Sequence, residues 1–480
     1  MTRGVGAHPA AAAPMSVATP SPFAGIAFSA WAAAFAVGTI IHLWQGAPSF
    51  WSVDPVVAVG AFAVLLRPTA PARLVVLFGL LVVEVVAWLP DLSNHQILVG
   101  VLGVTFVGWW LGLRWRAPAQ ALDPAVMYER VAPFLRVAFI LMWAFAGIAK
   151  LNTGFIDVVT TCSVWVLESI PGVHVPQGLS PLVIAGSISL ELMVPALLLF
   201  HRTRPFAVVL GFGFHLVSAF AGHASFSGFL WSFYLLFLPP AMIARAVVTV
   251  RRALPGRVRG GIAVAVARTP LTLVVLGGLW VISRLVLLPE GLQLPARNWG
   301  AALACTLWMG LCGWLLVRLR RHWIGAPGPR VSLRVRNVVM LFGLGLLVAT
   351  AATPYLGLKT RASLTMFSNL RTEPGHWNHL FVPEAVRVFD WQDGEVRFLG
   401  TADPELAAEI ADNASEHTVL LDARQMVDDF TDATVRYELD GVQRIATPVS
   451  ADPVLGEPQS PVQSWLGAMR PFIDGGTCQQ

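Results

Sequence analysis

Lysine and acidic residues are scarce in this chain. Only Lys150 and Lys359 are lysines among 33 basic residues, and charged residues make up 13% of the 480 positions. A soluble globular chain carries about 25% charged residues. Hydrophobic residues make up 55% and the mean hydropathy is +0.65. The low charge excludes a soluble globular protein and indicates an integral membrane protein that packs against the lipid bilayer.

Acidic residues are nearly missing from the first 356 positions, which hold nine of the 28. Residues 357–480 hold the other 19, together with nine basic residues. We therefore expect a membrane module followed by a polar, net acidic, soluble module. The formal charge of +5 reflects arginines near lipid headgroups, so no nucleic-acid partner is expected.

Apolar segments recur along the membrane module and predict an all-α polytopic helix bundle of about eleven transmembrane helices. They lie at 23–44, 51–66, 74–90, 96–113, 131–149, 181–200, 205–222, 226–247, 270–289, 299–317 and 337–356. The second is short for a span of about 20 residues. The first lacks a cleavage site, which favours an uncleaved helix over a signal peptide. Residues 1–22 are predicted to form a disordered tail.

Arginine is also nearly missing from every second loop. It gathers in 67–73, 114–130, 201–204, 245–269 and 318–336, whereas the alternate loops hold almost none. The positive-inside rule places the arginine-rich loops in the cytoplasm. We therefore predict a multi-pass protein of the cell membrane, with a cytoplasmic N-terminus. An odd number of spans puts residues 357–480 outside.

The outer module is predicted to be a small α+β domain. "AVRVFDWQDGEVRFLG" and "VRYELDGVQRIA" alternate around turn residues, as hairpins do. "DPELAAEIADNAS" predicts a helix between them.

Several motifs of known chemistry are missing. The chain has no nucleophile elbow, P-loop or kinase motif set, and "GFG" at 211–213 follows no strand. "HWNH" (376–379) has metal-like spacing, but no cysteine or further histidine cluster accompanies it. No metal is expected.

Ionisable residues inside spans are costly and suggest a site. Six are predicted in the outer half of the bundle: Glu84, His95, Lys150, Glu191, His215 and His223. The alternatives are a helix-start hydrogen bond for His95 and hydrogen bonds between helices for Glu191 and His215, and Glu84 is similarly ambiguous. The sequence leaves open whether these groups face one pocket.

Lys150 ends the fifth predicted span, in "AFAGIAKLNTGF". A lysine there can reach the headgroups or cap the helix. Arginine does the same work everywhere else in the bundle, but arginine is effectively always protonated, whereas lysine can act as a base. We therefore consider Lys150 a candidate base in a dry site.

These residues resemble a known family. "FAGIAKLNTGF" is similar to the lysine motif of the vitamin K-dependent γ-carboxylases and their bacterial relatives, the HTTM proteins. "LSNHQILVGVLG" resembles their Asn-His element, "TRPFAVVLGFGFHL" and "FSGFLWSFYLLFLPP" their next helices, and "MFSNLRTEPGHWNHLF" the segment after the last span. The resemblance covers roughly residues 23–400.

The resemblance implies roles for named residues. Lys150 would deprotonate reduced vitamin K or menaquinol, which then reacts with O₂, removes a glutamate γ-proton and leads to addition of CO₂. His95 would orient or stabilise the reacting species, and the pocket for quinone or substrate would include Asn94, Glu84, Trp143, Glu191 and His215. Animal enzymes carry two adjacent lysines, and Ala149 occupies the first of those positions here.

Three functions remain open on the sequence. The first is a quinol-dependent membrane carboxylase acting on an unknown protein or peptide substrate. The second is a quinone-binding redox protein, and the third is a non-catalytic assembly or export factor.

The four cysteines divide by location. Cys305 and Cys312 lie in the tenth predicted span, where they should stay reduced. Cys162 and Cys478 fall outside under the predicted topology and are candidates for a disulfide in an oxidising compartment.

Overall fold

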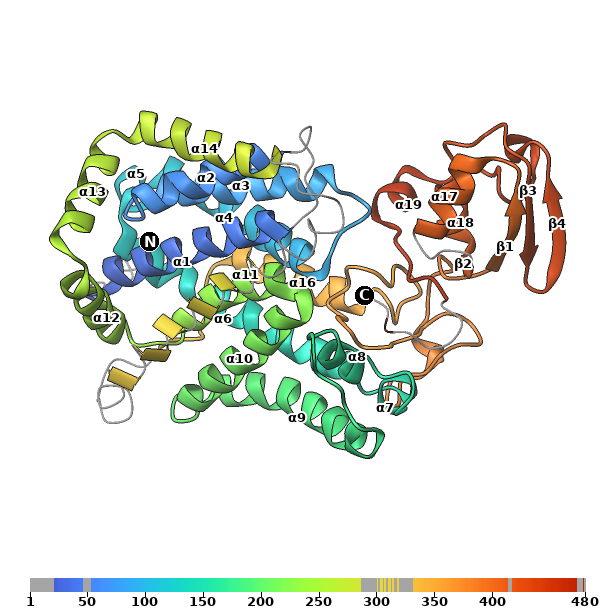
Figure 1. Cartoon of the computed structure of the whole chain (residues 1–480), viewed down its shortest axis with the longest axis horizontal. Helices are drawn as coiled ribbons and strands as arrows, with labels where there is room; N and C mark the ends of the chain where they lie inside the picture. The colour runs from blue at the N-terminus through green and yellow to red at the C-terminus, as the bar shows by residue number, and fades with distance from the viewer. Residues whose placement is uncertain are drawn as a thin grey trace, which may run out of the picture.

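The computed structural model describes residues 21–45, 53–285, 331–412, 417–472 and 478, with residue 300 and scattered positions between 303 and 318. It is mostly helical, with a helix bundle at one end and a small antiparallel sheet near the C-terminus at the other (Figure 1). The sheet domain is set apart from the bundle, and residues 353–392 lie between them.

The helices of the bundle are joined mostly by short connections. They are α1 (Ala24–Gln45), α2 (Asp54–Leu66), α3 (Pro71–Ala87), α4 (Asn94–Arg116), α5 (Pro118–Leu122), α6 (Pro124–Ala149), α7 (Thr153–Ile156), α8 (Cys162–Glu168), α9 (Ser180–Leu199), α10 (Arg204–Ser218), α11 (Ala224–Leu235), α12 (Pro240–Ala253), α13 (Gly256–Ala267), α14 (Thr269–Leu285) and α16 (Val338–Ala352).

In the part of the chain that the structure describes, five helical segments are long and apolar enough to cross a membrane, or six if the bent pair α13–α14 counts as one span. They are Ala24–Trp44, Asn94–Arg116, Pro124–Ala149, Gln177–Leu199 and Arg204–Leu235. Eleven spans are not confirmed. Two of the predicted segments form shorter apolar helices, α2 and α16, and segment 299–317 lies largely outside the described residues, as do Cys305, Cys312 and most of the predicted N-terminal tail.

The predicted span 226–247 is wrong as a single helix. The chain leaves α11 after Leu235 and starts α12 at Pro240, because two successive prolines, Pro239 and Pro240, cannot continue the helical hydrogen bonds. The buried Arg136 guanidinium donates to the Leu236 carbonyl at 2.6 Å and so satisfies this helix end. The predicted loop 245–269 likewise holds α12 and α13.

Helix α11 lies at the centre of the bundle, against α1 and α10. Glycines permit this close packing. A Cβ on Gly38 of α1 would stand 2.3 Å from the Gly228 carbonyl oxygen, and one on Gly211 of α10 would stand 2.0 Å from the Tyr234 hydroxyl. Gly222, at φ +91°, turns the chain between α10 and α11.

The sheet has the order β2-β1-β3-β4 and is antiparallel throughout. Its strands are β1 (Glu395–Thr401), β2 (His417–Val419), β3 (Val435–Leu439) and β4 (Val442–Ala446), with helices α17 (Pro404–Asp412), α18 (Leu420–Val427) and α19 (Pro461–Leu466). The hairpin at Asp440-Gly441 is confirmed, and both turn residues have the positive φ that such turns require. The helix predicted in "DPELAAEIADNAS" is α17.

The hairpin predicted around Asp393-Gly394 is wrong. Its second half is β1, but β1 pairs with β2 and β3. The first half forms no strand, because the backbone N–H groups of Val388 and Phe389 both donate to the Leu356 carbonyl after α16. This segment is thus tied to the helix bundle.

Candidate functional site

A largely apolar cavity of about 540 Å³ opens among α6, α8, α9, α10 and α11. We call it the first cavity. Aromatic and aliphatic side chains form most of its wall, including Trp143, Leu190, Leu210, Phe214 and Phe226. Lys150, Glu191 and His215 also border it. A cavity of this size and character is typical of a binding site for a hydrophobic small molecule.

Lys150 is the C-cap of α6, and its side chain turns inward. Lys150 Nζ lies 2.8 Å from Glu191 Oε2 of α9 and donates to the Met366 carbonyl at 2.7 Å. The side chains of Lys150 and Glu191 are 4% and 5% exposed. Lys150 therefore does not reach toward the headgroups; it forms a buried ion pair at the wall of the first cavity.

Gly147 makes this ion pair possible. It lies three residues before Lys150, and a Cβ there would meet Leu192 Cδ2 at 2.8 Å and the Glu191 carbonyl carbon at 3.1 Å. The missing side chain lets α9 approach α6 at the level of Glu191. The small residues of "FAGIAK" thus set the distance between the two charged groups.

His215 of α10 borders the first cavity, and the residue is 1% exposed. Neither ring nitrogen has a hydrogen-bond partner among the residues that the structure describes. The ring packs against Trp143 and Phe226, with centroids 5.3 Å from each. A buried polar group without a partner is costly unless something else satisfies it, so His215 is a candidate to bind a ligand.

The Met366 carbonyl belongs to a loop with unusual backbone geometry. Four of its residues have φ between +47° and +59°, a region that is disfavoured for residues other than glycine: Ala362, Leu364, Phe367 and Asn369. Arg470 holds this loop in place by donating to the Thr365 carbonyl at 2.6 Å and to Ser368 Oγ at 3.3 Å. Burial lowers the pKa of Arg470 to about 10.

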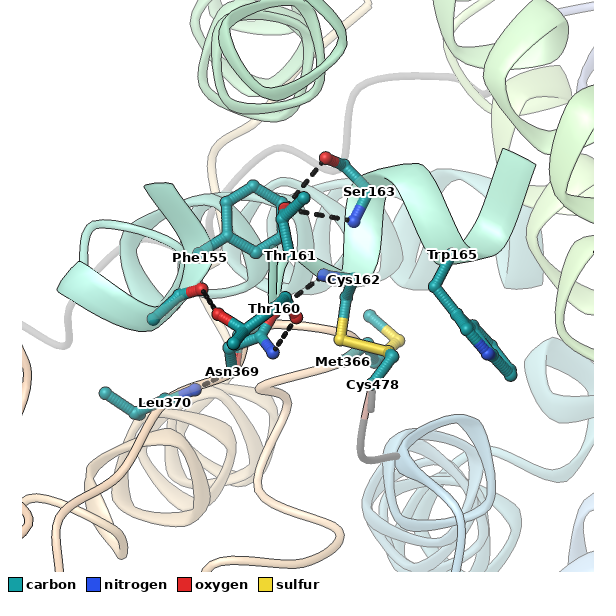
Figure 2. Close-up of a disulfide and its surroundings, with 12 residues drawn as sticks. Phe155, Thr160, Thr161, Cys162, Ser163, Trp165, Met366, Asn369, Leu370 and Cys478 are labelled. Carbon is teal, nitrogen blue, oxygen red and sulfur yellow. Dashed lines mark hydrogen bonds between the residues drawn. A yellow bond between two sulfur atoms is a disulfide. The ribbon is translucent and has the colours of Figure 1, made fainter. Parts of the chain in front are cut away.

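Polar contacts also clamp this loop to the segment after Lys150. Asn152 Nδ2 donates to the Ser368 carbonyl at 2.6 Å. Asn369 Oδ1 accepts from the Cys162 backbone N–H at 2.8 Å, and Asn369 Nδ2 donates to the Thr160 carbonyl at 2.9 Å (Figure 2). Cys162 and Cys478 form a disulfide beside Met366 (Figure 2). The asparagine of the lysine motif is thus a structural residue.

A second cavity of about 420 Å³ lies on the other side of the loop and is more polar. Asn94, His95, Asp91, His223 and Arg361 border it. The two cavities share part of their walls: Phe226, Met366 and Phe367 border both. The loop residues Met366 and Phe367 therefore separate the chamber of Lys150 from the chamber of His95.

His95 belongs to a hydrogen-bonded group behind the second cavity. His95 Nε2 lies 3.1 Å from His42 Nδ1, and His42 Nε2 lies 2.9 Å from Glu84 Oε1. Glu84 is 2% exposed and borders neither of the two cavities. Sequence reasoning missed His42, which lies in the last turn of α1.

The residues singled out in the sequence thus fall into two groups. Lys150, Trp143, Glu191 and His215 border the first cavity, and Asn94 and His95 border the second. Glu84 lies with His42 and His95. The two histidines of "HWNH" have separate partners: His376 Nε2 contacts Glu395, whereas His379 Nε2 donates to the Ile148 carbonyl. Among the described residues no cluster of three or more potential ligands could hold a metal ion.

These features define a membrane protein with several apolar helices and a site divided between two chambers. Residues 64–240 match the family model of the HTTM domain. The predicted resemblance to HTTM proteins is confirmed over these residues. They include Lys150, His95 and Glu191, but His42 and Met366 lie outside them. No curated protein and no solved structure matches the chain.

Proposed function

We propose that this chain is a quinol-dependent membrane enzyme of the γ-carboxylase-like class. One observation carries the proposal: a buried Lys150–Glu191 pair borders an apolar cavity of about 540 Å³. An apolar chamber suits a flat, lipid-soluble ring, and an ionisable pair inside it suits proton transfer at a ring hydroxyl. The HTTM match supports the relation to carboxylases and leaves the activity to be tested.

The residues present fit a quinol. The imidazole of His215, which has no hydrogen-bond partner among the described residues, could donate to or accept from a ring oxygen. Trp143 and Phe226 offer aromatic faces for the ring. When bound, the quinol would supply a hydroxyl proton and reducing equivalents for a reaction with O₂, as the resemblance implies.

Lys150 and Glu191 act as one proton-accepting unit in this proposal. At a separation of 2.8 Å, an ammonium beside a carboxylate and a neutral amine beside a carboxylic acid differ only in the place of one proton. In either arrangement the pair takes up one proton and becomes an ammonium beside a carboxylic acid. The Met366 carbonyl accepts from Nζ and so holds Lys150 in place. We assign the accepted proton to Lys150 Nζ in the second of these arrangements, in which the neutral amine has a lone pair.

The second cavity would receive the carboxylation substrate. Asn94, His95 and Arg361 offer polar groups there, in reach of an anionic glutamate side chain and CO₂. The thin wall of Met366 and Phe367 would let chemistry started in the first cavity act on the second. We propose only the class of this substrate, a peptide or protein that supplies a glutamate side chain.

The topology belongs to the same proposal. We propose a multi-pass protein of the cell membrane with about eleven spans, a cytoplasmic N-terminus and residues 357–480 outside. The Cys162–Cys478 disulfide supports the outside location, because structural disulfides persist in oxidising compartments.

Incorporation of labelled bicarbonate tests the carboxylase function. Membranes containing the full chain would receive reduced quinol, O₂, labelled bicarbonate and a glutamate-containing peptide library. We expect acid-stable label in peptide with the parent chain, and a loss of about 10²–10⁴-fold for Lys150→Arg, because arginine cannot supply a base near neutral pH. Lys359→Arg is the matched control: Lys359 is also buried, burial lowers its pKa to about 8, and it borders neither cavity.

The other outcomes identify the competing functions. Bound quinone without label in peptide would favour the quinone-binding redox protein, which uses the same first cavity. The absence of both bound quinone and labelled peptide would favour the assembly or export factor. A fully active Lys150→Arg variant would contradict the role of Lys150 as the base.

A further inference from the structure

Four side chains form a hydrogen-bonded chain that leads away from the second cavity. Ser93 Oγ lies 3.0 Å from His95 Nδ1, His95 Nε2 lies 3.1 Å from His42 Nδ1, and His42 Nε2 lies 2.9 Å from Glu84 Oε1. Ser93 and His95 border the cavity, whereas Glu84 is buried on α3. The chain connects α1, α3 and the start of α4.

The direction of these hydrogen bonds is fixed at one end. Gln96 Oε1 accepts from the Ser93 backbone N–H at 2.9 Å, and because a backbone N–H can only donate, the contacting atom must be the amide oxygen. Ser93 Oγ lies 2.8 Å from the same oxygen and must donate to it. Ser93 Oγ is then left to accept, so His95 Nδ1 carries a proton.

Two proton arrangements satisfy every bond of the chain. In the first, His95 is an imidazolium, its Nε2–H donates to His42 Nδ1, His42 Nε2–H donates to Glu84, and Glu84 is a carboxylate. In the second, Glu84 is a carboxylic acid that donates to His42 Nε2, and His42 Nδ1–H donates to His95 Nε2. Both arrangements contain the same number of protons and the same net charge.

We propose that Glu84, His42 and His95 form a proton relay, with His42 as its bridging residue and Glu84 as its proton store. Starting from the second arrangement, Glu84 passes its Oε1 proton to His42 Nε2, and His42 passes its Nδ1 proton to His95 Nε2. His95, now an imidazolium, gives its Nδ1 proton to a basic group in the second cavity. Glu84 loses one proton, the basic group gains one, and no electrons move. A proton taken up later at the bare His95 Nδ1 refills the store.

An aromatic residue fixes the orientation of the two histidines of the relay. Phe229 packs against both imidazoles, with centroid distances of 4.9 Å to His42 and 6.0 Å to His95. Glu84 Oε2 has no hydrogen-bond partner in the described part of the chain, and Oε1 is the oxygen that faces His42 and carries the acid proton. His223, Asp91 and Arg361 also border the cavity but are not members of the relay.

The use of this relay in turnover rests on the proposed function, whereas the relay itself does not. It would supply a proton to a basic group that turnover leaves in the second cavity, and it would be refilled at His95 Nδ1. Glu84 does not border the second cavity, and His42 borders it without being assigned a contact with substrate. Glu84 is therefore a storage group and His42 a positioning group.

Difference infrared spectroscopy of the full chain in lipid nanodiscs, titrated with acid and without any quinol, tests the relay. The carbonyl stretch of protonated Glu84 is identified by its loss in Glu84→Gln. We expect its titration midpoint to shift by more than about one pH unit in His42→Gln and in His95→Gln, as expected for coupled sites. His223→Gln, in the same cavity but outside the relay, is the control and should shift it less.

An unchanged Glu84 midpoint in both His42→Gln and His95→Gln would overturn the relay. Equal shifts in all three histidine variants would also overturn it, since they would indicate a general field effect. His42→Asn provides a second bridging variant if His42→Gln does not fold. Because no quinol is present, failure of the proposed carboxylase function leaves this result unaffected.

Discussion

Lys150 Nζ and Glu191 Oε2 lie 2.8 Å apart, near the point where Gly147 of α6 packs against Glu191 and Leu192 of α9. Both side chains are almost fully buried. Removing two charges from water is costly, and such a pair seldom stabilises a fold more than apolar residues of the same volume would. Its presence beside an apolar cavity therefore points to chemistry more than to stability.

The ion pair predicts an asymmetry between single and double variants. Lys150→Met leaves the Glu191 carboxylate buried without its cation, so we expect a loss of about 3–5 kcal/mol in stability. Lys150→Met combined with Glu191→Leu should recover most of that loss, because no unpaired charge remains. Thermal unfolding of the three chains in nanodiscs measures the difference, and equal destabilisation by the single and double variants would contradict a coupled pair.

The Cys162–Cys478 disulfide joins two residues that are 316 positions apart in the sequence. Cys162 borders the first cavity, so the disulfide connects the wall of this cavity to the C-terminal segment. We expect Cys478→Ser to lower stability by about 2–5 kcal/mol. Mass mapping of the parent under non-reducing conditions should recover the linked peptides. Free thiols at both positions in freshly prepared membranes would contradict the pairing.

Asp422 predicts a pH dependence at the base of the sheet domain. Burial raises its pKa from 3.8 to about 7, against the opposing effects of Arg361 and the Met469 backbone N–H. The folded state thus binds this proton more tightly than the unfolded state. The contribution of this bound proton to the stability of the folded state is full below about pH 4 and is lost as pH rises through 7.

The variant Asp422→Asn isolates that contribution. It cannot ionise, so the loss of stability between pH 5 and pH 8 should be smaller in this variant than in the parent. Denaturant unfolding of the full chain, followed by a probe on the sheet domain, gives both slopes. Identical pH dependence in the two chains would show that Asp422 ionises as freely as in water.

A reporter fused after Gln480 tests the topology. A reporter that is active only in the cytoplasm should be silent there, and one that requires export should be active. A fusion after Arg116, in an arginine-rich loop, serves as the opposite control. Cytoplasmic activity after Gln480 would mean that the number of spans is even.

Sequence reasoning located the charged residues but not their groupings. Lys150, Glu191 and His95 stood out because ionisable residues inside apolar segments are rare. The same criterion applied to "IIHLWQ" at the end of the first segment would have found His42. The contact between His42 and His95 spans 53 residues, and no local pattern indicates it.

The loop at Met366 could not be foreseen for a different reason. It contributes a backbone carbonyl to Lys150, and every residue type has one. Its left-handed residues, such as Leu364 and Phe367, contradict local preferences and are held by tertiary contacts with Arg470. The failed hairpin at Asp393-Gly394 has a similar cause, since contacts with Leu356 replaced local strand pairing.

The quinone content of the purified chain tests the central claim most directly. Gly213 borders the first cavity and Gly345 of α16 does not, and at both positions an added Cβ meets open space. The account predicts that the parent and Gly345→Leu retain quinone through purification, whereas Gly213→Leu, which fills the cavity, loses most of it. Equal quinone content in all three chains, or none in the parent even after addition of menaquinone, would contradict a quinol site in the first cavity.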